Sequence, residues 1–75
     1  MITREQIQQK LSDYLKHSGM TQTELASRLG IRQQTVSAYI NGNKMPSIDT
    51  LANLCAIIDV DANDILCIGE YKKNN

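Results

Sequence analysis

The chain has 75 residues, no net charge, two cysteines, and neither phenylalanine nor tryptophan. We expect one small all-α domain whose core is built from Ile, Leu, Val, Ala and Tyr, as is common in helical bundles. Because the chain has one histidine, two scattered cysteines, no signal peptide and no long apolar span, we expect a reduced cytoplasmic protein without a metal ion, a cofactor or a membrane segment.

Residues 3–18 have the pattern of an amphipathic helix. Thr3 and Gln6 are spaced as a capping box, in which each side chain bonds the backbone of the other residue. Apolar residues recur at helical spacing and are expected to form a buried stripe: Ile7, Leu11, Tyr14 and Leu15. We expect this helix to support its neighbours.

A second helix is predicted to begin beside Thr21, which forms another capping box with Glu24. Its apolar face consists of Leu25, Ala26 and Leu29. Gly30 can adopt a positive φ, so the chain is expected to turn there and to bury Ile31 against the following helix.

The third predicted helix, at about residues 33–40, has an outer face without any charged residue. Val36, Tyr39 and Ile40 are expected to face inward. The outward positions are Gln33, Gln34, Ser37, Ala38 and Asn41. A merely solvated helix usually exposes Lys or Glu, whereas a Gln side chain offers a donor and an acceptor together, as adenine N6 and N7 require in the major groove of DNA.

An Asn-Gly-Asn run and Pro46 predict a loop before two further helices. Ser47 is expected to cap the fourth helix, with these residues inward: Ile48, Leu51, Leu54, Cys55 and Ile58. Asp61 is expected to cap a short fifth helix that contains Ile65 and Leu66. We assign residues 1–68 to a DNA-binding domain and 69–75 to a polar tail, with Ile65, Ile68 and Tyr71 as an alternative self-association patch.

Twelve spaced residues carry a resemblance to a known family: Gln22, Leu25, Ala26, Gly30, Gln33, Val36, Ser37, Gly42, Pro46, Leu51, Val60 and Leu66. They resemble the XRE-like helix-turn-helix family of the lambda and 434 phage repressors and Cro proteins. The resemblance covers residues 22–66 and implies a compact five-helix lambda-repressor-like domain. It also implies base-contacting roles for Gln33, Gln34, Ser37 and Ala38. Implied phosphate contacts are Gln22, Arg32, Thr35, Asn41, Asn43 and Lys44.

The chain departs from the family at two places. Many members carry an Arg late in the first helix that pairs with a Glu near the end of the recognition helix, and here these positions are Leu15 and Ile40. We expect an apolar contact in place of the ion pair. Arg32 stands where Ser or Thr commonly caps the recognition helix, so a cap worth about 1 kcal/mol is absent. A positive charge there is unfavourable against the helix dipole unless a phosphate lies nearby.

Charge is unevenly distributed along the chain. Residues 1–46 carry six basic and three acidic side chains, a net charge of +3, and residues 47–75 carry two basic and five acidic ones, a net charge of −3. We expect an electrically two-sided molecule whose positive side approaches DNA.

These patterns predict a sequence-specific double-stranded DNA-binding transcriptional regulator, a repressor of the phage or mobile-element type that acts as a homodimer, which could form only on its operator. No Gly-rich phosphate loop, activated nucleophile or carboxylate pair is evident, so we expect neither an enzyme nor a small-molecule substrate. Two alternatives stay open: an antitoxin-type autorepressor, and a protein-interaction module that keeps the fold without DNA binding.

Overall fold

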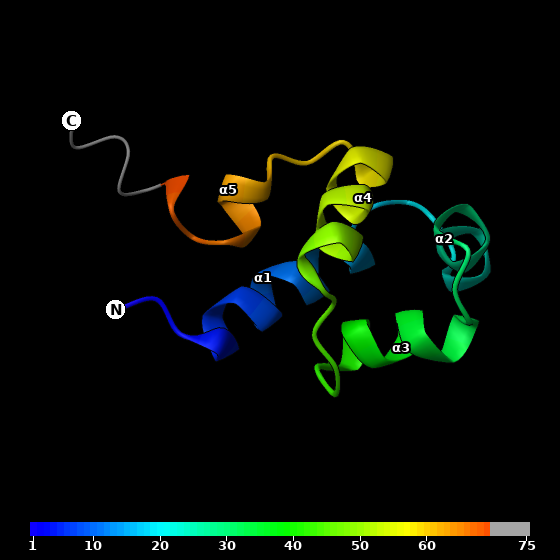
Figure 1. The fold of residues 1–75 in the computed structure, drawn as a ribbon, viewed down its shortest axis with the longest axis horizontal. Helices are drawn as coiled ribbons and strands as arrows, with labels where there is room; N and C mark the ends of the chain where they lie inside the picture. The colour runs from blue at the N-terminus through cyan, green and yellow to red at the C-terminus, as the bar shows by residue number, and fades with distance from the viewer. Residues whose placement is uncertain (70–75) are drawn as a thin grey trace.

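A computed structural model describes residues 1–69, in which five helices and no strand are found (Figure 1). The helices are α1 (Arg4–Lys16), α2 (Gln22–Leu29), α3 (Gln33–Asn41), α4 (Ile48–Ile58) and α5 (Ala62–Ile65). The predicted all-α, five-helix fold class is confirmed. Of the tail assigned to 69–75, residues 70–75 lie outside the described part of the chain.

The start of α1 is held by the predicted capping box. The Gln6 amide donates to Thr3 Oγ1 at 3.2 Å, and the Thr3 amide donates to Gln6 Oε1 at 2.8 Å. Leu11 and Leu15 of the predicted stripe are fully buried, and Ile7 and Tyr14 pack against the core at its edge. Local capping and a single apolar stripe therefore account for this helix.

At the start of α2 the predicted capping box is only half formed. Thr21 Oγ1 accepts from the Glu24 amide at 3.1 Å, as expected. The Glu24 carboxylate, however, pairs with Arg28 at 3.1 Å instead of returning to the Thr21 amide. An acidic residue four positions before a basic one favours this pairing on an exposed helix face.

The turn between α2 and α3 depends on Gly30, as predicted. Its φ is 70°, in the left-handed region that suits glycine. The Ile31 amide then donates to the Ala26 carbonyl at 3.0 Å, which closes the end of α2. Ile31 is half-buried and packs against the core.

The start of α4 differs from the prediction in two ways. The Ser47 hydroxyl makes no cap bond to the backbone, because it donates to Asp49 Oδ1 at 2.6 Å and also lies 3.0 Å from Thr50 Oγ1. Hydrogen bonds from Ser47, and then from the Asp49 and Thr50 amides, lower the pKa of the Asp49 carboxyl. Ile48, predicted to face inward, is 89% exposed, because it lies one turn before Leu51, the first residue of α4 that packs against the core.

In α5 the predicted cap is present, since Asp61 Oδ1 accepts from the Asn63 amide at 2.9 Å. Ile65 is fully buried on the face of α5 that packs against the rest of the bundle. The alternative self-association patch is therefore wrong for Ile65, because its side chain is already part of the core. Ile68 is half-buried, and Tyr71 lies outside the described residues.

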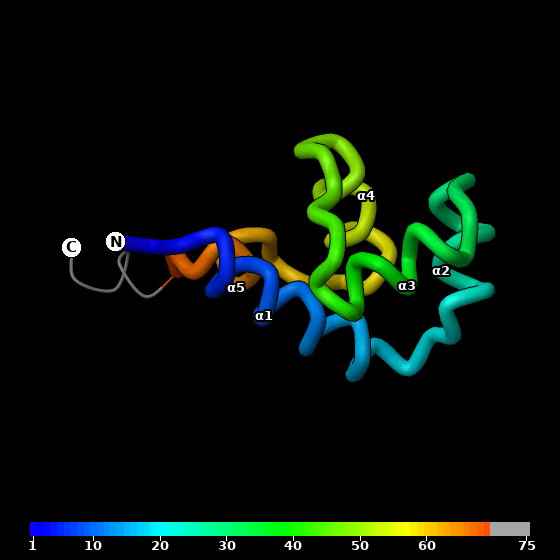
Figure 2. The backbone as a smooth tube through the Cα atoms, turned by 90° about the horizontal axis from the view of Figure 1, so that it is seen from below, coloured from blue at the N-terminus to red at the C-terminus, as the bar shows by residue number. Residues whose placement is uncertain are grey.

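The packing leaves one side of α3 uncovered. α3 packs against α1 and α2, α4 against α2 and α5, and α5 against α1. In Figure 1, α3 runs along the opposite edge of the molecule from the connection between α4 and α5. In Figure 2, which views the molecule from below, no other helix lies in front of α3.

The apolar replacement predicted for the family ion pair agrees with the packing. Leu15 is 1% exposed and belongs to the buried cluster, and Ile40 packs against that cluster. Because both Leu15 and Ile40 are apolar, a charged side chain at either position would have no ion-pair partner at the other.

We expect Leu15→Arg to lower the free energy of unfolding by about 3–5 kcal/mol, because the guanidinium would be buried without a carboxylate. Urea denaturation followed by circular dichroism measures the change. Leu15→Met serves as the control and should lower it by less than about 1.5 kcal/mol. An arginine variant with the midpoint of the parent protein would contradict the apolar packing.

Candidate nucleic-acid interface

The orientation of α3 is set by two inward side chains. Val36 is fully buried and Tyr39 is 4% exposed. Because these residues lie three apart, they occupy one side of the helix and turn Gln34 to the other side. Gln33, in the first turn, lies at the edge between the two sides. Both glutamines are exposed, as predicted from the sequence.

We call Gln33, Gln34, Ser37 and Ala38 the outer face of α3. Three of them, Gln33, Gln34 and Ser37, line a shallow surface hollow of ≈ 370 Å³ together with Gln22 from the start of α2. Side chains from both helices of the helix-turn-helix thus meet on one surface. Every lining side chain is neutral and can both donate and accept hydrogen bonds.

The remaining predicted contacts lie along α3 and just beyond its end. Thr35 and Ala38 are half-buried, whereas Asn41, Asn43 and Lys44 are exposed. Asn41 Nδ2 donates to Ser37 Oγ at 3.4 Å. The structure thus places Asn41, Asn43 and Lys44 at the C-terminal end of α3, while Thr35 lies within the helix.

Gly42 ends α3 with a φ of 80°. The chain then folds back on the helix, because the amides of Asn43 and Lys44 both donate to the Ala38 carbonyl, at 2.9 and 3.3 Å. This closure leaves the side chains of residues 43 and 44 at the surface beside the helix end.

Arg32 occupies the N-cap position of α3 without a side-chain cap bond, which confirms the predicted loss of the cap. Its side chain is exposed. Within residues 1–69 the ion pair found is that of Arg28 with Glu24, so the Arg32 charge has no carboxylate partner there.

One acidic residue from the acidic part of the chain, residues 47–75, lies near α3. The connection between α4 and α5, which carries Asp59 and Asp61, lies on the far edge of the molecule (Figure 1). Asp49, by contrast, lies near α3. Burial raises the pKa of the Tyr39 phenol, and the Asp49 carboxylate raises it further. The two-sided distribution of charge thus has an exception at the start of α4.

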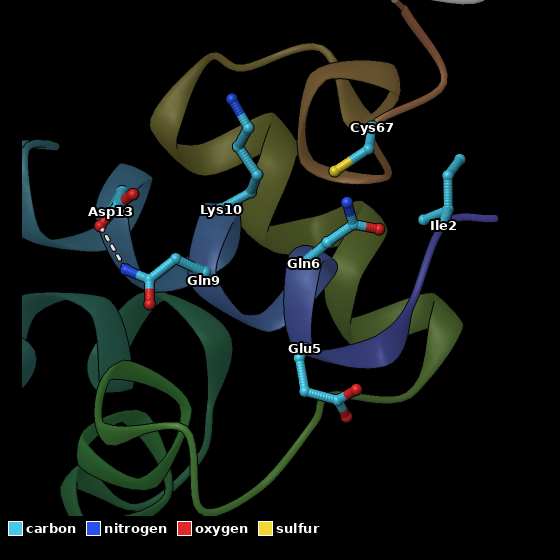
Figure 3. Close-up of a pocket in the computed structure, with 7 residues that line it drawn as sticks. All are labelled: Ile2, Glu5, Gln6, Gln9, Lys10, Asp13 and Cys67. Atoms are coloured by element: carbon cyan, nitrogen blue, oxygen red, sulfur yellow. Dashed lines mark hydrogen bonds between the residues drawn. The ribbon is translucent and has the colours of Figure 1, made fainter.

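A larger hollow of ≈ 440 Å³ lies on the other side of α1, beside Cys67 (Figure 3). Among its lining side chains, Gln9 Nε2 donates to Asp13 Oδ1 at 3.0 Å. The lining includes no histidine. In residues 1–69 no three His, Cys, Asp or Glu side chains are grouped to hold a metal ion. Burial, and then the charge of Asp61, raises the pKa of the other thiol, Cys55.

Sequence reasoning missed two side chains of α1 that bond the end of α3. Ser12 Oγ donates to the Ile40 carbonyl at 2.6 Å, and Gln8 Nε2 donates to the Gly42 carbonyl. The available signal was their spacing of four residues beside Leu11 and Leu15, which places both polar groups at the edge of the buried stripe.

Comparison with known proteins shows the family to which this arrangement of helices belongs. A helix-turn-helix family model matches residues 11–65, which include the end of α1 from Leu11 onward and all of the helices that follow it. The chain belongs to the XRE-type helix-turn-helix family. This family consists of DNA-binding regulators.

One relative of this helix-turn-helix protein is the ImmF control region 10 kDa protein of Bacillus phage phi105. The two are 34% identical over 53 residues, which cover 71% of this chain and 59% of the phage protein. No solved structure matches the chain. None of the helices within residues 1–69 has the length and apolar character needed to span a membrane.

Replacing Arg32 should separate stability from DNA binding in this helix-turn-helix protein. We expect Arg32→Ser to raise the free energy of unfolding by about 1 kcal/mol, because the serine can cap α3. The same change should lower affinity for DNA if Arg32 contacts a phosphate, as the sequence predicts. Thermal melting and fluorescence anisotropy at two salt concentrations measure the two effects. A variant that binds DNA as tightly as the parent protein would argue against a phosphate contact by Arg32.

Proposed function

We propose that the protein is a sequence-specific regulator that binds a double-stranded DNA operator by placing α3 in the major groove. The observation that carries this proposal is the charge-free outer face of α3, held outward by buried Val36 and Tyr39. Residues 1–68 are proposed as the DNA-binding domain. Their base-contacting residues are Gln33, Gln34, Ser37 and Ala38.

The chemistry of the outer face favours base contact over simple solvation. The major groove admits an α-helix, and a Gln side chain can bond adenine N6 and N7 together. Ser37 adds a hydroxyl, and Ala38 offers a methyl group that suits contact with thymine. A charged face would instead bind phosphates without regard to sequence.

The proposed phosphate contacts flank this face. Gln22 and Arg32 lie beside the N-terminus of α3. Asn41, Asn43 and Lys44 lie at its C-terminus, and Thr35 lies between these two groups. A major groove is bordered by two sugar-phosphate backbones, so contacts at both ends of the recognition helix would fix its register. Arg32 and Lys44 would supply the salt-dependent part of the affinity.

We further propose that the protein is a repressor of the phage or mobile-element type that acts in the cytoplasm. Its similarity to a phage control-region protein supports this reading. Occupation of an operator by a small domain suffices to block access of other proteins to the same DNA. The relative is matched over 59% of its length, so this proposal concerns the shared domain.

Gln33 and Lys44 should respond differently to alanine substitution. On an operator selected from random DNA, Gln33→Ala should lower the binding free energy by about 1–3 kcal/mol and relax the preference at one base pair. Lys44→Ala should weaken binding to all sequences alike and flatten the dependence on salt. Fluorescence anisotropy on matched and single-mismatch duplexes tests both. Equal losses on every duplex for both variants would contradict base contact by Gln33.

We propose that two copies bind a palindromic operator, because one recognition helix contacts only a few base pairs and paired half-sites lie about 34 Å apart. Analytical ultracentrifugation should show one protein per single half-site duplex and two per palindromic duplex. The free protein at the same concentration serves as the reference for assembly without DNA. A single copy on the palindrome at saturation would contradict the dimer.

A further inference from the structure

We propose that Gln8 and Ser12 of α1 are positioning residues that hold the end of α3 and so place residues 42–44 for contact with DNA. This inference deepens the proposed function and depends on it for the identity of the partner. The clamp, meaning Gln8 and Ser12, is neither part of the outer face nor among the residues expected to contact DNA.

The clamp acts on the carbonyl groups at the end of α3. The last carbonyls of a helix have no intrahelical partner and need another donor. Here the Ile40 carbonyl accepts from Ser12 Oγ at 2.6 Å, and the Gly42 carbonyl accepts from Gln8 Nε2. Two side chains four residues apart on α1 thus satisfy the end of a helix that lies far away in the sequence.

The clamp is built into the packing between α1 and α3. Ser12 is 5% exposed, and within residues 1–69 it is the buried polar residue of the core. A Cβ atom added at Gly42 would lie 3.3 Å from Gln8 Cδ and 3.4 Å from Gln8 Nε2. Two features therefore favour glycine at position 42: its φ of 80°, and the close approach of the Gln8 side chain.

The segment held by the clamp carries proposed phosphate contacts. Gly42 is followed at once by Asn43 and Lys44, whose amides return to the Ala38 carbonyl. Lys16 and Asn41 line the same groove of ≈ 430 Å³ as Gln8, Ser12 and Gly42. A shift of residue 42 away from α1 would consequently move the Lys44 ammonium relative to the outer face.

Direct contact with DNA does not explain these two residues. Ser12 is almost wholly covered, and its hydroxyl proton is already donated to Ile40. The Gln8 amide is likewise engaged with Gly42, while α3 separates α1 from the outer face. Any effect of these residues on DNA affinity must therefore pass through the loop at 42–44.

A double-mutant cycle tests this coupling. We expect Gln8→Met, which keeps the length of the side chain but removes its donor, to lower operator affinity about 5-fold. In a background that already carries Asn43→Ala and Lys44→Ala, the same change should lower affinity by less than about 2-fold, because nothing remains to be positioned. Losses of equal size in both backgrounds would overturn the clamp.

Gln9→Met is the matched control, because Gln9 lies next to Gln8 on α1 but bonds Asp13 within the same helix. It should change affinity by less than about 2-fold in both backgrounds. Ser12→Ala gives a second variant, which should show the same coupling to residues 43 and 44. Thermal melting of every variant separates loss of fold from loss of positioning.

Amide hydrogen exchange distinguishes failure of the clamp from failure of the proposed function. In protein without DNA, Gln8→Met should speed exchange at the Asn43 and Lys44 amides about 5-fold relative to Gln9→Met, with the α2 amides unchanged. Equal rates at residues 43 and 44 in the two variants would refute the clamp. Absence of any selected DNA sequence for the parent protein would instead refute the proposed function and leave the exchange result to decide on the clamp.

Discussion

The inward anchoring of α3 by Val36 and Tyr39 is the constraint on which the proposed interface depends. Both side chains are buried between α3 and its neighbours, so the helix cannot turn about its axis without exposing them. Such a turn would also bury Gln33 and Gln34, and each amide buried without a partner costs about 1–3 kcal/mol. Core packing therefore determines which side chains can meet DNA.

Most helix boundaries followed from signals that lie within a few residues of each other. Thr3 with Gln6, and Gly30 at its positive φ, act through bonds to the nearby backbone, and these predictions are confirmed. The errors arose where partners compete. Glu24 pairs with Arg28 and not with the backbone, and Asp49 engages the Ser47 hydroxyl that was expected to cap α4.

Tertiary shape accounts for the other differences. Periodicity alone placed Ile48 inward, but this first residue of α4 lies outside the core and is exposed. Ile65 is fully buried in the core and cannot join a surface patch. The outward position of Gln34 was predictable because helical spacing places it opposite Val36 and Tyr39. Spacing also places Gln8 and Ser12 beside the buried stripe of α1, but it does not indicate which groups they bond, because their partners lie 34 and 28 positions away in the sequence.

The neutral total charge of the chain agrees with an interface in which sequence preference matters more than bulk attraction. Selection of bound duplexes from a random DNA pool by the purified protein tests this most directly. The account predicts enrichment of one short motif, together with loss of preference at part of it when Gln33 and Gln34 are both replaced by alanine. Binding that enriches no motif at any salt concentration, or a motif unchanged by the double replacement, would contradict it.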